Sequence, residues 1–184
     1  MESNSIVKMT YNSKLVESAP RMIRLVTLFL VFFGMAANCH AKNNCPWLNE
    51  ATAGGLLGGD AVGDFTAASA SQPAVCTFTQ TGANFTRTLR ITVEVTPDTH
   101  ARLQTAAQPC GKNAAPMQAI GNEASMCAIE SRNAAPSEFV AGRVRDQLFT
   151  ITFTTTLKDD PILTRPALKE KAYTAAEQVA GNLF

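Results

Sequence analysis

The amino-acid sequence predicts an α+β fold, in which an antiparallel sheet of about five strands carries helices packed mainly on one face. Residues 85–95 (FTRTLRITVEV) and 148–157 (LFTITFTTTL) alternate apolar and polar side chains, which indicates strands with one buried face. From about Pro166 to the end, apolar residues recur at helical spacing. Four widely spaced cysteines indicate that disulfides staple this fold.

The first 41 residues have the anatomy of a secretory signal. A basic segment precedes an uncharged apolar core of 13 residues, 25–37, and small residues follow it. A helix that spans a bilayer needs about 20 apolar residues, so this core is too short for a comfortable membrane span. We expect cleavage after Ala41 and one exported α+β domain over 42–184, either periplasmic or extracellular.

Lipidation at Cys39 is one alternative to this cleavage. A lipoprotein signal needs a small residue directly before the lipidated cysteine and usually a Leu-like residue two places earlier. Asn38 and Ala36 occupy these places and fit poorly. We therefore expect a mature chain with no lipid anchor and no transmembrane span. A chain held in the membrane by an uncleaved leader is the other alternative, and translation from Met9 or Met22 shortens the leader.

The charge of the mature chain excludes an electrostatic interface for nucleic acid. Removal of the leader leaves 12 Lys and Arg against 13 Asp and Glu, a net charge of −1. Without a basic run, the chain lacks the positive patch that nucleic-acid binding requires, and acidic membranes are not favoured either.

An even number of cysteines remains in the exported domain: Cys45, Cys76, Cys110 and Cys127. No CxxC pair is present, which argues against a zinc or redox motif. Of three possible connectivities we favour Cys45–Cys76 with Cys110–Cys127, because sequential pairing joins each helix and its loop to the strand that follows. Each closed loop stabilises by about 3–4 kcal/mol on the chain-entropy model. Free buried cysteines are the alternative.

The elements are expected in the order helix, hairpin, helix, strand, hairpin, helix. The first helix begins at Cys45 and ends in the glycine cluster of 54–59, because glycine terminates helices. Residues 60–73 are small and polar, which predicts a loop. Residues 76–79 then pair with 85–95 as the first hairpin.

Thr96 and Pro97 predict the start of the second helix, with the threonine as cap and the proline in the first helical position. This helix runs to about Ala107. The remaining expected elements are a strand at 126–130, a hairpin of 139–145 and 148–157 with a tight connection at Asp146 and Gln147, and the final helix from about Pro166.

The outer faces of the two long strands are rich in threonine, for example Thr88, Thr92, Thr150 and Thr152. Exposed sheet faces commonly have this composition, so we favour a solvated face over a groove lined by these threonines.

The layout of CPWLNEATAGGLLGG, CTFT, LRITVEV, AIGNEA and GRVRDQLFTITF resembles a family of small exported bacterial domains of unknown function, many of them actinobacterial lipoproteins. Cys45, Leu57-Gly58, Cys76 and 121–124 match the family's landmarks. The resemblance implies a Mog1/PsbP-like fold and a Cys45–Cys76 disulfide, and it brings no catalytic residues. The chain departs from the family in its poor lipobox and its two further cysteines.

We assign no catalytic, metal-binding or cofactor-binding residue from the sequence. His100 is the single histidine of the mature chain and lies in no nucleophile motif, so a helix-surface position is favoured. The acids on or beside strands are Glu94, Glu123, Glu130 and Asp146. A suitably separated pair would make a glycosidase, but salt bridges and solvated turns explain most such residues.

The favoured function is a non-enzymatic exported domain that binds an envelope partner protein or a small ligand through the sheet face or the loop 59–73. Arg143 and Arg145 alternate on one strand and are the candidate contacts for an anionic partner, although an exposed strand face also explains them. One alternative is a carboxylate-dependent hydrolase of cell-wall or glycan substrates. The other is a secreted inhibitor or effector, which requires 59–73 to be an ordered protruding wedge.

Overall fold

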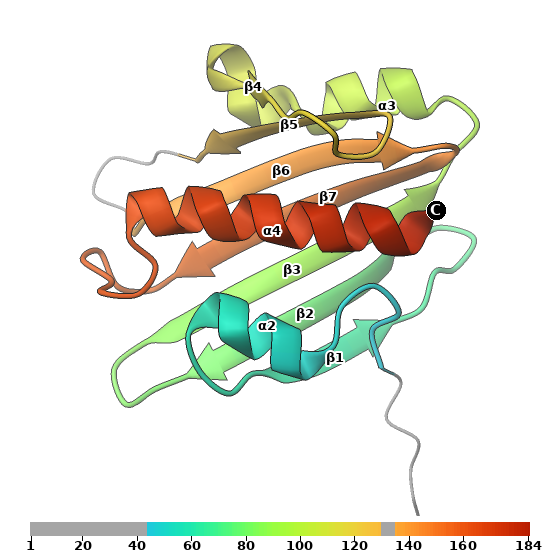
Figure 1. Ribbon diagram of the computed structural model, residues 1–184. Coiled ribbons are helices and arrows are strands. Elements are labelled where there is room, and N and C mark those ends of the chain that lie inside the picture. The colour runs from blue at the N-terminus through green and yellow to red at the C-terminus, as the bar shows by residue number, and fades with distance from the viewer. Residues whose placement is uncertain (1–43, 130–134) are drawn as a thin grey trace, which may run out of the picture. The chain divides into compact units, whose positions relative to one another are not determined.

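The computed structural model describes residues 44–129 and 135–184, so the expected signal peptide, its cleavage site and Cys39 lie outside the described residues. The described chain forms one antiparallel sheet in the order β1-β2-β3-β7-β6-β5-β4 (Figure 1). Its strands are β1 (Val62–Thr66), β2 (Ala74–Thr81), β3 (Thr86–Val95), β4 (Ala115–Pro116), β5 (Glu123–Ala128), β6 (Ser137–Val144) and β7 (Gln147–Thr155). Its helices are α2 (Glu50–Leu57), α3 (Thr99–Ala106), the 3-10 helix η1 (Gln108–Asn113) and α4 (Arg165–Leu183).

The predicted α+β class with an antiparallel sheet is confirmed, but the predicted number of strands is wrong. The described residues form seven strands instead of about five. The strand β1 lies inside the expected loop 60–73, where it pairs with β2 and places Phe65 opposite Cys76. Phe65 packs edge-on against Trp47, with ring centroids 6.1 Å apart. The five residues VGDFT do not show a period of two, because their two large apolar side chains, Val62 and Phe65, are three positions apart.

Several element ends differ from the prediction because side-chain caps decide them. The first helix begins at Glu50, since Asn49 accepts a hydrogen bond from the amide of Thr52, 2.8 Å away. It continues to Gly58, which ends it in the left-handed conformation with φ of 88°. In α3 the cap is Asp98 instead of Thr96, and its carboxylate accepts from the amide of Ala101.

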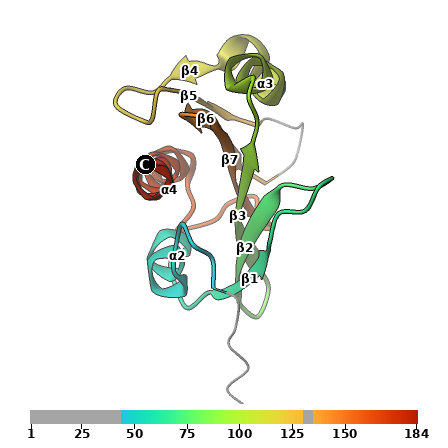
Figure 2. The ribbon, with the colours of Figure 1, turned by 90° about the vertical axis from the view of Figure 1, so that its right-hand side faces the viewer.

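The main core lies between the sheet and the two helices α2 and α4, which cover the same face (Figures 1 and 2). The inward alternation expected for the two long strands is present. The fully buried side chains on these strands are Leu89, Ile91, Phe149, Ile151 and Phe153. On α4, Ala172, Ala175, Ala176 and Val179 are fully buried, so small residues let this helix lie close to the sheet.

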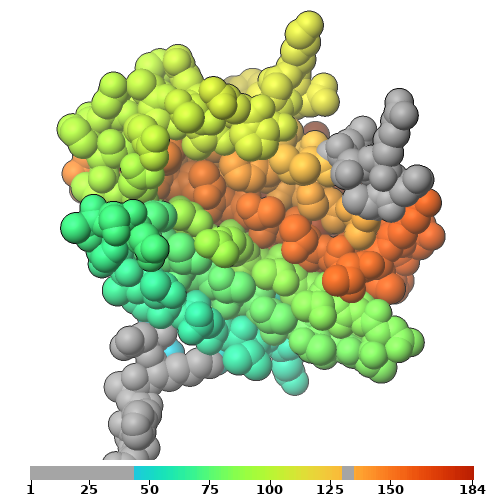
Figure 3. Space-filling model, turned by 180° about the vertical axis from the view of Figure 1, so that it is seen from behind, coloured from blue at the N-terminus to red at the C-terminus, as the bar shows by residue number. Residues whose placement is uncertain are grey.

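The opposite face carries α3 over β6 and β7 (Figures 2 and 3). Leu103 of α3 packs there with Ala141 and Leu148 in a second, smaller core. Next to it, Thr77, Arg90 and Thr152 form a row across β2, β3 and β7. The outer face of the sheet is therefore covered by α3 at one side and polar beyond it.

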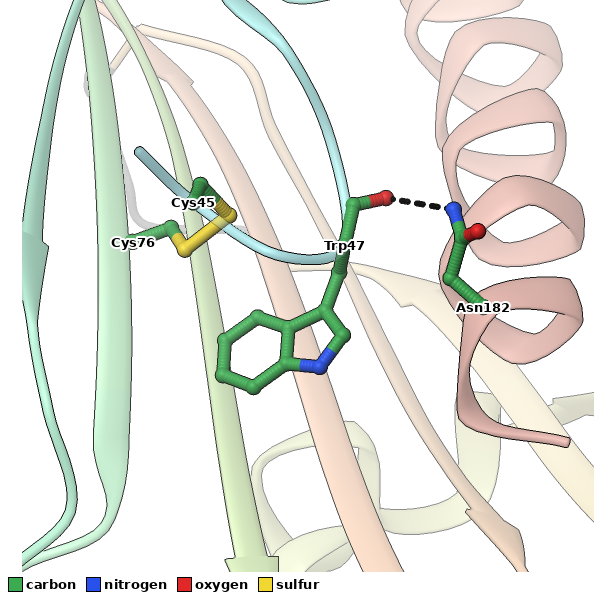
Figure 4. Close-up of a disulfide and its surroundings, with 4 residues drawn as sticks. All are labelled: Cys45, Trp47, Cys76 and Asn182. Atoms are coloured by element: carbon green, nitrogen blue, oxygen red, sulfur yellow. Dashed lines mark hydrogen bonds between the residues drawn. A yellow bond between two sulfur atoms is a disulfide. The ribbon is translucent and has the colours of Figure 1, made fainter. Parts of the chain in front are cut away.

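The described residues form two disulfides, Cys45–Cys76 and Cys110–Cys127, which is the connectivity favoured from sequence order. Figure 4 shows the first beside Trp47, whose carbonyl oxygen accepts a hydrogen bond of 2.9 Å from Nδ2 of Asn182 near the end of α4. The segment that enters α2 is thus tied both to β2 and to α4.

Candidate functional site

A pocket of about 250 Å³ lies between β5, β6 and the first turn of α4. Its apolar wall includes Met126, Ile129, Pro136 and Leu168. Its polar and charged lining side chains are Asn113, Ser137, Glu138, Arg165 and Lys169. A concave apolar site with a few convergent polar groups is the usual form of a small-ligand site.

The alternation of β6 places Glu138 in this pocket. Along the strand, Glu138 is in phase with Val140 and Val144, which are fully buried on the inner face. In the ladder it lies opposite Ala128 of β5 and Phe153 of β7. An acid therefore occupies the first inward position of β6, on an otherwise apolar strand face.

Glu138 is 6% exposed, and the described residues give its carboxyl group no hydrogen bond. Every fully inaccessible side-chain nitrogen and oxygen of the described residues has a partner. The Glu138 oxygens must therefore stay partly accessible to solvent. This access is through the pocket that Glu138 lines. Burial raises the pKa of Glu138, and the charge of Lys169 offsets this only in part.

The start of α4 supplies the cations of the pocket. Thr164 caps the helix by accepting a hydrogen bond from the amide of Ala167. Arg165, Leu168 and Lys169 then follow at positions i, i+3 and i+4, which lie on one side of a helix. Leu168 is buried, so this side of α4 is the one that closes the pocket.

A second buried charge, Asp160, differs from Glu138 because it is saturated. Its carboxylate binds the guanidinium of Arg87 at 2.7 and 2.8 Å and the hydroxyl of Thr155 at 2.7 Å. The amides of Ile162 and Leu163 also donate to it. Burial alone would raise the pKa of Asp160, but these hydrogen bonds outweigh burial and hold that pKa well below its usual range. Five hydrogen bonds saturate the Asp160 carboxylate, so this cluster serves the fold.

Three of the side chains weighed from the sequence meet on the surface. His100 Nδ1 lies 3.0 Å from Glu123 Oε2, and Arg143 Nε donates to the same oxygen at 3.2 Å. Burial would raise the pKa of Glu123, but the hydrogen bonds from His100 and Arg143 lower it. His100 is 57% exposed, which agrees with the helix-surface position expected for it. Glu94 pairs with Arg102.

Arg143 and Arg145 do not share a strand face. Arg143 lies on β6, whereas Arg145 follows the strand with φ of 54°. The turn of this hairpin is therefore formed by Arg145 and Asp146, one residue earlier than expected. The Arg145 guanidinium lies 5.6 Å from the ring centroid of Phe184. A partner contact through these two arginines stays a prediction, and Glu130 lies outside the described residues.

Of the predicted loop 59–73, residues 62–66 form the strand β1, and residues 67–73 are the connection from β1 to β2. Within this connection (Figure 2), Ser69 and Gln72 form an isolated antiparallel bridge. Among the described residues, no group of three or more His, Cys, Asp and Glu is arranged for a metal ion. Within the same residues, no helix is long and apolar enough to cross a membrane.

Sequence reasoning missed Glu138, although the sequence contains a signal for it. In SEFVAGRV the glutamate has the same phase as the two inward valines. An acid in phase with the buried side of a strand is costly unless it is paired or used, so this phase marks it as a candidate.

Substitution of Glu138 by glutamine is expected to stabilise the protein at neutral pH. The raised pKa means that the folded state binds this proton more tightly than the unfolded state. The stabilising effect of protonated Glu138 is full below the unfolded pKa of about 4.3, and it is lost as the pH rises through the folded pKa. Glu138→Gln should raise the free energy of unfolding by about 1 kcal/mol at pH 7 and leave it unchanged near pH 4.

Urea unfolding at both pH values measures this effect. Glu123→Gln is the matched control, because the pKa of Glu123 is lowered and the substitution should destabilise at pH 7 instead. A Glu138→Gln protein that is less stable than the wild type at pH 7 would contradict the unpartnered state of this carboxyl group.

Comparison of the chain with family models, with curated proteins and with solved structures gave no match, so the function is argued from the pocket and its residues.

Proposed function

We propose that the protein is a non-enzymatic exported domain that binds a small ligand in the pocket at Glu138. The observation that carries the proposal is the nearly buried carboxyl group of Glu138, which has no hydrogen-bond partner among the described residues and lines the pocket. Buried polar groups without a partner are rare in native proteins, because they cost stability. A ligand that bonds this carboxyl group would offset that cost.

The exported location is part of this proposal. Two disulfides fit an oxidising compartment, either the periplasm or the extracellular space. We also propose that the fold is Mog1/PsbP-like and related to the small exported bacterial domains described above. The support for that relation is the Cys45–Cys76 bond and the antiparallel sheet with helices over one face.

Binding is preferred over hydrolysis because of the acids in the pocket. A glycosidase of the usual kind needs two carboxyl groups about 5–9.5 Å apart across its substrate. Among the described residues that line the pocket, Glu138 is the only acid. One carboxyl group beside a lysine suffices to orient a ligand.

A fragment screen by two-dimensional NMR tests the proposal. We expect small amphiphilic fragments to shift the amide signals of Met126, Ala128, Leu168 and Lys169 at millimolar concentration. Ala128 lines the pocket and is solvent-exposed, so Ala128→Phe should fill the pocket and abolish these shifts without unfolding the protein. Ala101→Phe, at an exposed position of α3 outside the pocket, is the control and should bind as the wild type does. Fragment binding that ignores Ala128→Phe, or no binding at all, would contradict the proposal.

A further inference from the structure

We infer that a second cleft, near the C-terminal end of α4, binds a neutral peptide segment through the indole N–H of Trp47 and the side-chain oxygen of Gln147. The cleft has a volume of about 540 Å³ and is lined by Trp47, by residues 68–74, by the end of β3 and by the start of β7. It shares no lining residue with the pocket at Glu138, so this site goes beyond the proposed function.

Trp47 supplies an unused hydrogen-bond donor to this cleft. Its side chain lines the cleft and the residue is only 8% exposed, yet no described residue accepts a hydrogen bond from its indole N–H. All fully inaccessible side-chain nitrogens in the described part of the chain are bonded, so Nε1 of Trp47 stays accessible to solvent. Figure 4 shows this nitrogen on the side of the ring that faces away from the Cys45–Cys76 disulfide. Because buried tryptophans usually find a partner for this N–H, the unused donor indicates a ligand acceptor.

Gln147 supplies the matching acceptor. Its Nε2 donates to the carbonyl of Leu183 at 3.2 Å, which holds the side chain against the last turn of α4. The described residues give its Oε1 no hydrogen bond, so this oxygen can accept one from a ligand. The backbone carbonyl of Trp47 is bonded to Asn182 in the same turn of α4. One helix end therefore positions both the donor and the acceptor in the same cleft.

The charges in the cleft are already paired. Its charged lining side chains are Glu94 and Arg102, which bond each other at 2.9 and 3.1 Å. An ionised ligand would have to compete with this pair for a counter-charge. One unused N–H donor and one unused oxygen acceptor instead match the C=O and N–H groups of a neutral amide.

The walls and volume of the cleft favour a peptide over a glycan. Val93, Val95 and Ala74 offer hydrocarbon contact, and Val95 is 72% exposed. The volume equals that of roughly 18 waters at about 30 Å³ each, which corresponds to three or four small amino-acid residues. Clefts of this size are typical of ligand sites. Small apolar side chains suit these walls, whereas each hydroxyl group of a glycan would need a polar partner.

Trp47 is the single tryptophan of the chain, so its fluorescence and its indole ¹H–¹⁵N signal report directly on this cleft. The probe is N-acetyl-trialanine N-methylamide, a neutral peptide of matching size. We expect it to bind at millimolar concentration, to shift the indole proton downfield and to change the emission. N-acetyl-trisarcosine N,N-dimethylamide has the same carbonyls but no N–H group. It should bind about five- to tenfold more weakly, because one hydrogen bond is lost.

Variants assign the two groups. Gln147→Met should weaken the trialanine probe about five- to tenfold and leave the trisarcosine probe nearly unchanged, because only the first probe donates to Gln147. Gln104→Met is the matched control, at an exposed position of α3 outside the cleft. Trp47→Phe keeps an aromatic ring but removes the donor. It should weaken both probes alike, as followed by the amide signal of Val95.

The possible results separate this inference from the proposed function. Equal affinity for the trialanine and trisarcosine probes would contradict recognition of peptide N–H groups by Gln147. Tighter binding of N,N′-diacetylchitobiose than of the trialanine probe would make the cleft a glycan site and overturn the inferred ligand class. The inference also fails if no probe moves the indole signal at about 10 mM. Ala128→Phe, which fills the pocket at Glu138, should leave peptide binding unchanged, so either site can fail alone.

Discussion

Replacement of Asp160 by alanine is expected to lower the free energy of unfolding by about 3–5 kcal/mol, because it leaves the Arg87 guanidinium as an unpaired buried charge. Arg87 is 3% exposed, and both of its bonds to Asp160 are short, at 2.7 and 2.8 Å. The same guanidinium also donates to the carbonyl of Leu57 at the end of α2 and to the side chain of Gln80. The loss of the Asp160 carboxylate therefore loosens the end of α2 together with the segment that leads into α4.

Chemical denaturation of Asp160→Ala and Arg102→Ala measures the difference between a buried and an exposed pair. Arg102 bonds Glu94 at 2.9 Å, but the pair is open to solvent, so Arg102→Ala should barely move the unfolding midpoint. The double substitution Arg87→Met with Asp160→Leu should recover much of the loss, because it removes both buried charges. Equal effects of the two single substitutions would contradict this interpretation.

The Asp160 cluster also sets the acid side of the stability profile. Its folded pKa is depressed, so its contribution is full above the unfolded value of about 3.9 and is lost as the pH falls through the folded pKa. Wild-type protein should lose stability below about pH 4 more steeply than Asp160→Asn, which is measured by denaturation across this range.

Removal of the Cys45–Cys76 bond is expected to cost about 3–4 kcal/mol. The bond closes a segment with a sequence separation of 31, which restricts the unfolded chain strongly on the chain-entropy model. Cys76 is fully buried, so the double substitution by alanine also removes packed sulfur atoms. Thermal and urea unfolding of Cys45→Ala with Cys76→Ala measures the loss.

The second disulfide provides the comparison. Cys110–Cys127 closes a separation of 17, so its removal should cost slightly less stability. Because Cys127 lines the pocket, Cys110→Ala with Cys127→Ala should also weaken ligand binding there, which removal of Cys45–Cys76 should not do. A pocket that binds its fragments equally well after both removals would show that the second bond serves stability alone.

The parts of the fold that could be predicted are those with a long local pattern. The strands β3 and β7 show a period of two over nine or more residues, and α4 shows helical spacing over 19 residues. The strand β1 was missed because Val62 and Phe65 are three positions apart and break the period of two, and β4 was missed because two residues are too few for any period. Their pairing is decided by neighbouring strands, and this tertiary context is absent from a local pattern.

The pocket was harder to predict than the strands because its walls are distant in sequence. Asn113, Met126, Glu138 and Lys169 come together only when β5, β6 and α4 are in place. The phase of Glu138 on β6 is visible in the sequence, but its lack of a hydrogen-bond partner among the described residues is a property of the packed structure. The surface pairs at Glu94 and Glu123 agree with the expectation that salt bridges explain acids on strands.

The strand order divides the sheet into two meanders, which meet only along the β3–β7 ladder. Cys45–Cys76 joins the segment before α2 to the first meander and Cys110–Cys127 joins η1 to the second, so neither bond crosses this seam. The two crosslinks can therefore be oxidised independently, and a chain that enters an oxidising compartment N-terminus first can close the first bond before β7 has arrived. Correct pairing then needs no long-range search, because each cysteine finds its partner within its own half of the sheet.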